Sequence, residues 1–213
     1  DNRNVARMAL LLAGLPKEVP GTTVNRNCSS ALEAVNLAAK TILVGEGDLA
    51  IGSGVECMSR APWAMMKPER LPTTSPPKMW DTTVGWRFNN AKMDEMYPIV
   101  SLGEGAEIIA EEMQISRDDQ DAYSLESHSR AIAAINDGKF KDEIIEISVP
   151  QRRGDPVVVD TDEHPRYEKS NGKYEMAIDT ESLAKLRPAF KKDGSVTAGN
   201  SSGINDGAAA LLL

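Results

Sequence analysis

Apolar residues recur at helical spacing near the start of the chain, over positions 4–13 and again over positions 28–44. Glycines follow each stretch, and glycine commonly ends a helix. Two shorter stretches are predicted as strands: residues 22–26, which follow a turn at 16–21, and residues 48–55, which carry Leu49, Ile51 and Val55. The pattern therefore predicts a mixed α/β unit in the first part of the chain.

The pattern changes over residues 62–91, where five prolines and all three tryptophans lie. This composition indicates a long loop with local structure, and such loops in compact proteins are usually functional or disordered. The final apolar run, 207–213, is ambiguous between helix and strand. Between these two regions we expect helices at residues 103–114, 117–136 and 179–188, and strands at residues 144–149 and 156–159.

The formal net charge of −8 is distributed over the 213 residues without a basic block. Nucleic acid is not an expected partner, because its binding needs a clustered basic face. Neither an apolar run of roughly 18 residues nor a secretory signal pattern is found, so no membrane association is expected. Two cysteines form no disulfide framework, which favours a reducing compartment. We expect a cytoplasmic protein, with an organellar matrix as the alternative.

Cys28 stands where a predicted strand gives way to a predicted helix, in the run Asn-Arg-Asn-Cys-Ser-Ser. Unpaired backbone N–H groups and the positive end of the helix dipole stabilise a thiolate at such a position. The thiolate is the form of cysteine that acts as a nucleophile. Most free cysteines are instead small buried hydrophobes, and this run alone leaves both interpretations open.

Three longer runs are informative together. They are Thr-Thr-Val-Asn-Arg-Asn-Cys-Ser-Ser-Ala-Leu-Glu-Ala at 22–34, Gly-Ser-Gly-Val-Glu-Cys-Met-Ser-Arg-Ala-Pro at 52–62, and Val-Thr-Ala-Gly-Asn-Ser-Ser-Gly-Ile-Asn-Asp-Gly-Ala-Ala-Ala at 196–210. These runs resemble consecutive signatures of the thiolase family, the Claisen-condensing acyl-CoA transferases. Further similarity lies at 116–123, 138–144 and 185–190, so the resemblance extends from about Asn4 to the end.

The resemblance implies a layered α-β-α core with an inserted loop domain. Residues 1–60 correspond to part of the core, residues 61–196 to a loop domain that contacts coenzyme A (CoA), and residues 197–213 to the return to the core. The family has an earlier strand and helix and a whole second half. Because the chain begins without Met and ends on an uncapped apolar run, we expect the retained part of a longer protein, with targeting signals outside it.

The chemistry implied by the resemblance centres on Cys28. In thiolases this cysteine attacks the carbonyl of a 3-ketoacyl-CoA and holds the acyl group as a thioester, which a second CoA thiol then removes. CoA is a cosubstrate, and no metal or tightly bound cofactor is expected. The family's Gly-His-Pro and Cys-x-Gly motifs and its oxyanion-hole Asn do not occur in these residues. We expect them beyond Leu213, so the chain alone should be inactive.

Two alternatives to this assignment remain. One is a ketosynthase-type condensing enzyme of the same fold. The other is a non-catalytic CoA-binding or assembly subunit, which the missing catalytic motifs suggest.

Three residues match CoA- or substrate-binding positions of the family. Ser202 matches the serine that hydrogen-bonds the pantetheine arm, with a turn-stabilising role as the alternative. Arg166 matches an arginine beside the adenine, but the segment after it is longer than usual, and a solvated arginine is the alternative. Arg87 lies in a run, 81–88, that looks like β-ketoadipyl-CoA thiolases, enzymes of aromatic-compound breakdown. It is expected to pair with a distal carboxylate of the substrate or in a structural ion pair.

Three other residues are assigned no chemistry. His128 is expected on a solvated helix face, His164 in a loop, and Cys57 as a packed thiol at the end of a strand.

Assembly is also implied by the resemblance, since thiolases pair through core strands beside the nucleophile. We expect a homodimer or a dimer of dimers. Strands 22–26 and 48–55 are the expected interface, because Gly52 and Gly54 allow close approach.

Overall fold

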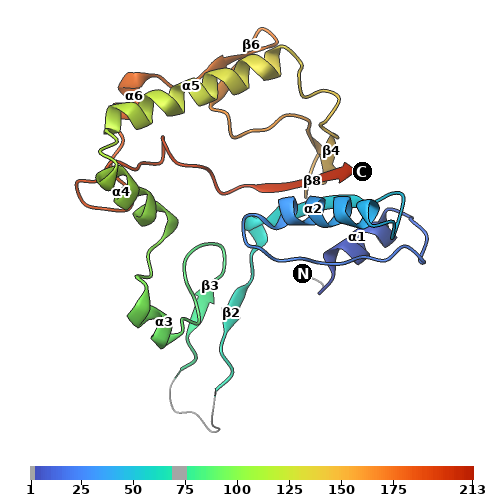
Figure 1. Ribbon diagram of the computed structural model, residues 1–213. Helices are drawn as coiled ribbons and strands as arrows, with labels where there is room; N and C mark the ends of the chain where they lie inside the picture. Colours follow the sequence, from blue (N-terminus) through green and yellow to red (C-terminus); the bar gives the residue numbers. More distant parts are fainter. Residues whose placement is uncertain (1–2, 69–75) are drawn as a thin grey trace. The chain divides into compact units, whose positions relative to one another are not determined.

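The computed structural model describes residues 3–68 and 76–213, which form two compact units (Figure 1). The first unit combines the chain up to Ala64 with Ile204–Leu213. The second is the continuous stretch Met65–Gly203. Within the described ranges, no helix is long and apolar enough to cross a membrane.

The first unit is organised around an antiparallel pair of strands. β1 (Ile51–Cys57) and β8 (Asp206–Leu212) pair along their whole length. The ladder continues beyond them, because the backbones of Ala50 and Leu213 exchange hydrogen bonds of 3.1 and 2.9 Å. The apolar run whose periodicity was ambiguous is therefore a strand.

Helix α2 (Ser30–Leu43) packs very closely against β1. A Cβ atom added to Gly52 would lie 2.7 Å from the Cα of Val35, and one added to Gly54 would lie 2.6 Å from the Cβ of Ala31. Both positions therefore need glycine. The close backbone approach predicted for these glycines is confirmed, and the neighbour is a helix of the same chain.

Helix α1 (Val5–Leu12) is held by side chains at its first turn. The carboxamide of Asn4 accepts a hydrogen bond of 3.0 Å from the backbone N–H of Arg7, and donates one of 2.6 Å to the carbonyl of Gly21. The guanidinium of Arg7 donates to the carbonyl of Lys17 at 2.6 Å. The loop after α1 is thereby fixed to the helix that precedes it.

The strand expected at residues 22–26 does not form, and an isolated bridge between Arg26 and Cys28 takes its place. The side chains of Asn25 and Ser30 bind the neighbouring backbone groups. Such local hydrogen bonds compete with strand pairing. For the same reason α2 begins at Ser30 rather than at residue 28.

Two long helices dominate the second unit. α4 (Leu102–Glu112) and α5 (Arg117–Asn136) lie where the apolar periodicity predicted them. Ser101 and Glu104 form a capping box at the start of α4, with hydrogen bonds of 3.2 and 2.6 Å. The short helices of this unit are α3 (Ala91–Met96) and α6 (Thr180–Ala184).

The strands that follow α5 form short antiparallel hairpins. β4 (Ile147–Val149) pairs with β5 (Val157–Val159), within the ranges predicted from the sequence. β6 (Tyr167–Ser170) pairs with β7 (Lys173–Met176), and this hairpin was not predicted. Earlier in the chain, before α3, a further short pair consists of β2 (Trp63–Met65) and β3 (Met79–Asp81).

The β6–β7 hairpin turns at Asn171 and Gly172, whose φ angles are 50° and 78°. Asn-Gly favours a two-residue hairpin because both residues tolerate positive φ. The rings of Tyr167 and Tyr174 meet edge to face with centroids 4.6 Å apart. Asn136, at the end of α5, exchanges hydrogen bonds of 2.7 and 2.9 Å with the backbone of Tyr174. The additional length in this part of the sequence is thus an ordered hairpin docked on α5.

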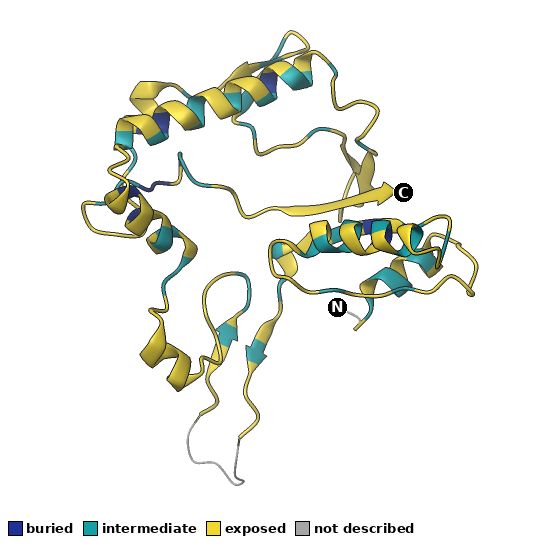
Figure 2. Ribbon diagram, viewed as in Figure 1, coloured by how far each residue is buried: buried dark blue, intermediate teal, exposed yellow. Residues whose placement is uncertain are grey.

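Few side chains in the described chain are fully buried (Figure 2). The strands of the first unit leave much apolar surface exposed, with exposed fractions of 54% to 68% for four of their side chains. These four are Ile51, Val55, Leu211 and Leu212. The buried apolar side chains are Ala38 in the first unit and Ala110, Ile132, Leu183 and Val196 in the second.

Candidate functional site

Cys28 lies in a tight turn that leads into α2, residues 25–30, here called the Cys28 turn. Asn27 has φ of 50°, in the left-handed region that asparagine tolerates better than most residues. The backbone closes on itself around the cysteine, because the N–H of Ser29 donates to Arg26 at 3.1 Å. Cys28 is exposed as a free thiol immediately before the helix cap at Ser29.

Two side chains within the Cys28 turn fix this conformation. The hydroxyl of Ser30 accepts a hydrogen bond of 2.8 Å from the N–H of Arg26 and donates one of 2.7 Å to the carbonyl of Asn27. The side chain of Asn25 accepts a hydrogen bond of 2.9 Å from the N–H of Asn27. Ser30 therefore bonds to the backbone on the N-terminal side of Cys28 at two places, and the thiol stands at the start of α2, where the helix dipole favours negative charge.

Cys57 is also exposed, so the packed thiol expected there was wrong. It does lie at the end of a strand, as expected, and precedes the short 3-10 helix η1 (Met58–Arg60). Its thiol donates to the carboxylate of Asp206 at 3.7 Å. The hydroxyl of Ser59, followed by its backbone N–H, holds the pKa of Asp206 below its usual range. Cys57 thus belongs to a polar contact that joins β1 to the start of β8.

Ser202 lies in an irregular stretch of the second unit, residues 195–203, here called the Ser202 segment. The side chain of Ser202 is exposed, whereas the hydroxyl of Ser201 is buried and has no hydrogen-bond partner among the described residues. Because the segment is neither helix nor strand, its conformation depends on contacts with other elements.

Glu107 on α4 provides one such contact, although only 4% of this residue is exposed. Its carboxylate accepts hydrogen bonds of 3.0 and 2.9 Å from the N–H of Ser195 and one of 2.8 Å from the N–H of Val196. Burial alone would raise the pKa of Glu107, but these N–H groups, the Ser195 hydroxyl and the charge of Lys191 together hold it below its usual value.

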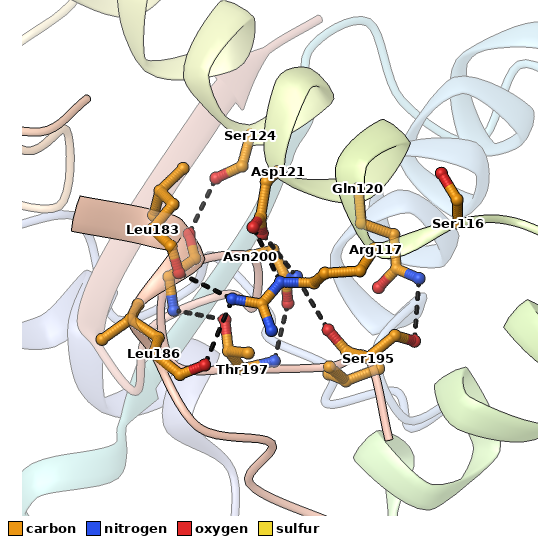
Figure 3. Close-up of polar contacts among 12 residues, drawn as sticks. Ser116, Arg117, Gln120, Asp121, Ser124, Leu183, Leu186, Ser195, Thr197 and Asn200 are labelled. Atoms are coloured by element: carbon orange, nitrogen blue, oxygen red, sulfur yellow. Dashed lines mark hydrogen bonds and ion pairs between the residues drawn. The ribbon is translucent and has the colours of Figure 1, made fainter. Parts of the chain in front are cut away.

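Asn200 and Asp121 provide a second contact (Figure 3). Asn200 donates hydrogen bonds of 2.9 Å to the carboxylate of Asp121 and 3.1 Å to the carbonyl of Ser195, and it accepts one of 2.7 Å from the N–H of Thr197. The other oxygen of Asp121 accepts a hydrogen bond of 2.7 Å from Nε of Arg117. Figure 3 shows dashed lines from this carboxylate to both Arg117 and Asn200.

Gly199 lies where the Ser202 segment packs against α5 and α6. The hydroxyl of Ser124 on α5 donates to the carbonyl of Gly199 at 2.7 Å. A Cβ atom added to Gly199 would lie 2.5 Å from side-chain atoms of both Leu183 and Leu186. A larger residue would therefore displace either the segment or these leucines.

Arg166 also contacts the Ser202 segment, since its guanidinium donates to the carbonyl of Ala198 at 2.8 Å. Its backbone N–H donates to Nδ1 of His128 at 3.4 Å, and the rings of His128 and His164 are 5.8 Å apart. Burial, followed by the charges of His164 and Arg166, holds the pKa of His128 below its usual value. His128 is thus half-buried rather than fully solvated, which corrects the surface position expected for it.

Arg87 lies apart from these contacts within the second unit. Its guanidinium donates to the carbonyl of Gly85 at 3.3 Å, and none of the ion pairs found among the described residues includes it. The neighbouring Trp86 donates from Nε1 to the carbonyl of Val100 at 2.7 Å. Arg87 is therefore exposed on a loop that Trp86 holds in place.

The structure thus brings Arg166 to the segment that carries Ser202, whereas Arg87 lies on a different loop and Cys28 belongs to the other unit. Sequence reasoning missed the buried carboxylates that hold this segment, because acidic residues on a helix usually face solvent. Across the described ranges, no group of three or more His, Cys, Asp or Glu side chains is arranged to hold a metal ion.

Comparison with known proteins decides the family. The profile described as "Thiolase, N-terminal domain" matches residues 1–213. The chain belongs to the thiolase family. Its α/β fold agrees, because it superposes on an acetyl-CoA acetyltransferase of Bacillus anthracis with a TM-score of 0.82 and 38% identity. That match covers 100% of this thiolase chain and 50% of the other protein.

Among its relatives, this thiolase chain is 51% identical to a β-ketoadipyl-CoA thiolase of Acinetobacter baylyi. It is 45% identical to a 3-oxoadipyl-CoA/3-oxo-5,6-dehydrosuberyl-CoA thiolase of Escherichia coli strain K12, and 46% identical to an acetyl-CoA acetyltransferase of Chromobacterium violaceum. Each match covers 100% of the chain and 51% of the relative. The chain therefore spans about half the length of these relatives.

Proposed function

We propose that this chain is the N-terminal half of a thiolase that transfers an acyl group between a 3-ketoacyl-CoA and CoA through an acyl-Cys28 intermediate. The observation that carries the proposal is the Cys28 turn, which presents a free, exposed thiol at the start of α2. A nucleophile needs access to its substrate and a favourable field for the thiolate, and a helix N-terminus supplies the second.

In the proposed reaction the Cys28 thiolate attacks the 3-keto carbonyl carbon. The C2–C3 bond of the substrate then breaks, its electron pair goes to C2, and a proton delivered to C2 releases acetyl-CoA. The thiolate of a second CoA attacks the acyl-Cys28 thioester and restores the Cys28 thiolate. The resemblance assigns the base and the proton donor to a His and a second Cys beyond Leu213. No metal or tightly bound cofactor takes part in these steps.

For the substrate we propose a 3-ketoacyl-CoA with a distal carboxylate. Relatives at 51% and 45% identity are named for β-ketoadipyl-CoA and 3-oxoadipyl-CoA, which supports this choice. Arg87, which is exposed, is the proposed partner of the distal carboxylate. Ser202 and Arg166 are the proposed contacts to the pantetheine arm and the adenine of CoA. The relative named acetyl-CoA acetyltransferase makes a short acyl chain the alternative.

For assembly we propose a homodimer or a dimer of dimers in the cytoplasm. The exposed apolar side chains of β1 and β8 support association, because contiguous apolar surface favours burial against a partner. Gly52 and Gly54 of β1 pack against α2, so they cannot form the interface between subunits that the sequence suggested for them. We also keep, as a proposal, the division into core at 1–60, CoA-contacting loop domain at 61–196 and return to the core at 197–213.

The test is mass spectrometry of the full-length protein after rapid mixing with β-ketoadipyl-CoA. We expect a succinyl group on Cys28, and loss of both the adduct and thiolysis in the Cys28→Ala variant. The Cys57→Ala variant is the matched control. It should keep the adduct and thiolysis, because the Cys57 thiol is hydrogen-bonded to Asp206 and does not stand at the start of an α-helix. Thiolysis retained by Cys28→Ala would disprove the proposal. If acetoacetyl-CoA but not β-ketoadipyl-CoA acylates the protein, Cys28 remains the proposed nucleophile and the proposed substrate becomes a short acyl chain.

A further inference from the structure

Asn200 ties the Ser202 segment together and connects it to α5. Its side chain bonds to Ser195 and Thr197 of the segment at 3.1 and 2.7 Å, and to Asp121 of α5 at 2.9 Å. Asp121 is therefore the point at which these internal hydrogen bonds are fixed to a helix. Moving the Asp121 carboxylate would move Asn200, and with it the backbone two residues before Ser202.

Asp121 itself is held firmly, because its exposed fraction is 4% and its charge is paired with Arg117 at 2.7 Å. The guanidinium of Arg117 is held in turn by the carbonyls of Leu183 and Leu186, at 2.6 and 3.3 Å. Figure 3 shows these groups converging below α5. Removing one member of a buried pair leaves an uncompensated charge, so the arrangement resists displacement.

A second ion pair on α5, which makes no hydrogen bond to the Ser202 segment among the described residues, can be compared with the pair of Arg117 and Asp121. Arg130 and Glu126 have the same spacing along the helix and the same 2.7 Å separation as Arg117 and Asp121. Their side chains, however, are 79% and 59% exposed, against 24% and 5% for the first pair. Exposed ion pairs of this kind contribute little to protein stability. Glu126 is therefore a matched control for Asp121.

We infer that Asp121 is a positioning residue for CoA, which acts through Asn200 to place the segment that carries Ser202. The inference rests on the proposed role of Ser202 as a contact to the pantetheine arm. Asp121 touches neither CoA nor the reacting atoms. Its loss should weaken the binding of CoA and leave the rate of the bound complex unchanged.

The experiment uses the full-length protein with Asp121→Asn. The amide keeps the shape of the carboxylate but has a single acceptor oxygen, so it cannot serve both Arg117 and Asn200. We expect the KM for CoA to rise about threefold to tenfold, the size expected from one lost hydrogen bond. The kcat at saturating CoA should stay within about twofold of the parent. Glu126→Gln should change neither value.

Binding is measured separately from chemistry by calorimetric titration with CoA in the Cys28→Ala background. Asp121→Asn should raise the Kd of CoA by the same factor as the KM. The double variant Asp121→Asn/Asn200→Ala should raise the Kd of CoA little more than Asn200→Ala alone, because both changes remove the same contact between Asp121 and Asn200. Where Asp121→Asn does not fold, Asn200→Ala replaces it, because that change leaves the buried ion pair intact.

A Kd and KM within twofold of the parent, or a fall in kcat without a change in KM, would overturn the inference. Additive effects of Asp121→Asn and Asn200→Ala on the Kd would also count against it. If the parent itself binds no CoA, the proposed function fails. If the parent binds CoA and Asp121→Asn binds it equally well, this inference alone fails.

Discussion

The Cys28 turn and the Ser202 segment are both irregular stretches that carry a proposed site residue, but they are held in opposite ways. The Cys28 turn is fixed by its own side chains, since Asn25 and Ser30 bond to backbone groups within the same six residues. The Ser202 segment has internal hydrogen bonds from Asn200, but it is also held by distant side chains, because Glu107 is 88 residues from Ser195 and Asp121 is 79 residues from Asn200. One is a local motif, and the other depends on the fold.

This difference has a physical consequence. The Cys28 turn needs only a short stretch of sequence to adopt its shape, so mutations elsewhere should leave its conformation unchanged. The Ser202 segment needs α4 and α5 in place, because its backbone N–H groups find their acceptors there. Mutations in either helix should therefore weaken CoA binding more than they change the reactivity of Cys28.

The largest effect on stability is expected from Glu107→Gln. The carboxylate accepts from two backbone N–H groups in a buried position, and the amide would place its NH₂ group opposite one of them. We expect a loss of about 2–3 kcal/mol in the free energy of unfolding, measured by denaturant titration of the full-length protein. Glu111→Gln, one turn along α4, removes the exposed pair with Lys191 and should have little effect. An equal effect of both variants would contradict the distinction.

The Cys28 turn should respond to Ser30→Ala. This change removes two hydrogen bonds, of 2.8 and 2.7 Å, and so loosens the turn without touching the thiol. We expect acylation of Cys28 in stopped-flow assays to slow by about tenfold, with a small change in unfolding temperature. Ser29→Ala is the control, because Ser29 makes no side-chain hydrogen bond as the cap of α2. A Ser30→Ala rate equal to that of the parent would show that the turn needs no such support.

The response to acid should differ between the two stretches. The pKa of Glu107 in the folded protein lies below its usual value of 4.5. Its contribution to stability is therefore complete above about pH 4.5 and is lost as the pH falls through the folded pKa. We expect the stability difference between the parent and Glu107→Gln to shrink as the pH is lowered from 7 to 3, as followed by denaturant midpoints. A constant difference over that range would argue that the carboxylate charge is irrelevant.

The smallest effect is expected at the two adjacent serines of the Ser202 segment. Ser201→Ala removes a buried hydroxyl without a partner in the described chain, and should raise stability by up to about 1 kcal/mol. Ser202→Ala removes an exposed hydroxyl, and should leave stability unchanged while raising the KM for CoA. Thermal unfolding and steady-state kinetics of the full-length protein measure both. If Ser201→Ala raised the KM for CoA and Ser202→Ala changed only stability, Ser201 rather than Ser202 would be the CoA contact.

Most of the helices, and the position of Cys28 beside a helix start, could be predicted from the sequence because their signals are local. The periodicity of α4 and α5 and the serine caps before them are examples. The β6–β7 hairpin was equally local but was missed, although Asn171-Gly172 is a strong turn signal. Only the unusual length of the segment after Arg166 was recognised.

The contacts of the Ser202 segment could not be predicted in the same way. Glu107 and Asp121 lie on amphipathic helices, where a carboxylate is ordinarily solvated. Their burial follows from the packing of the segment against those helices, which no local pattern encodes. Similarly, the strand expected at residues 22–26 does not form, and at its end the N–H groups of Arg26 and Asn27 bond to the side chains of Ser30 and Asn25, which apolar spacing does not reveal.

The pairing of β1 with β8 has a consequence for how the protein is made. The contact between Cys57 and Asp206 spans 149 residues of sequence. A ribosome adding about 5–20 residues per second needs roughly 7 to 30 s to reach β8 after β1 has emerged. During that interval the edge of β1 that later pairs with β8 has no partner, and other chains can join it. Because closing so long a loop also slows pairing, β1 is exposed to misassociation for longer than a strand whose partner is close in sequence.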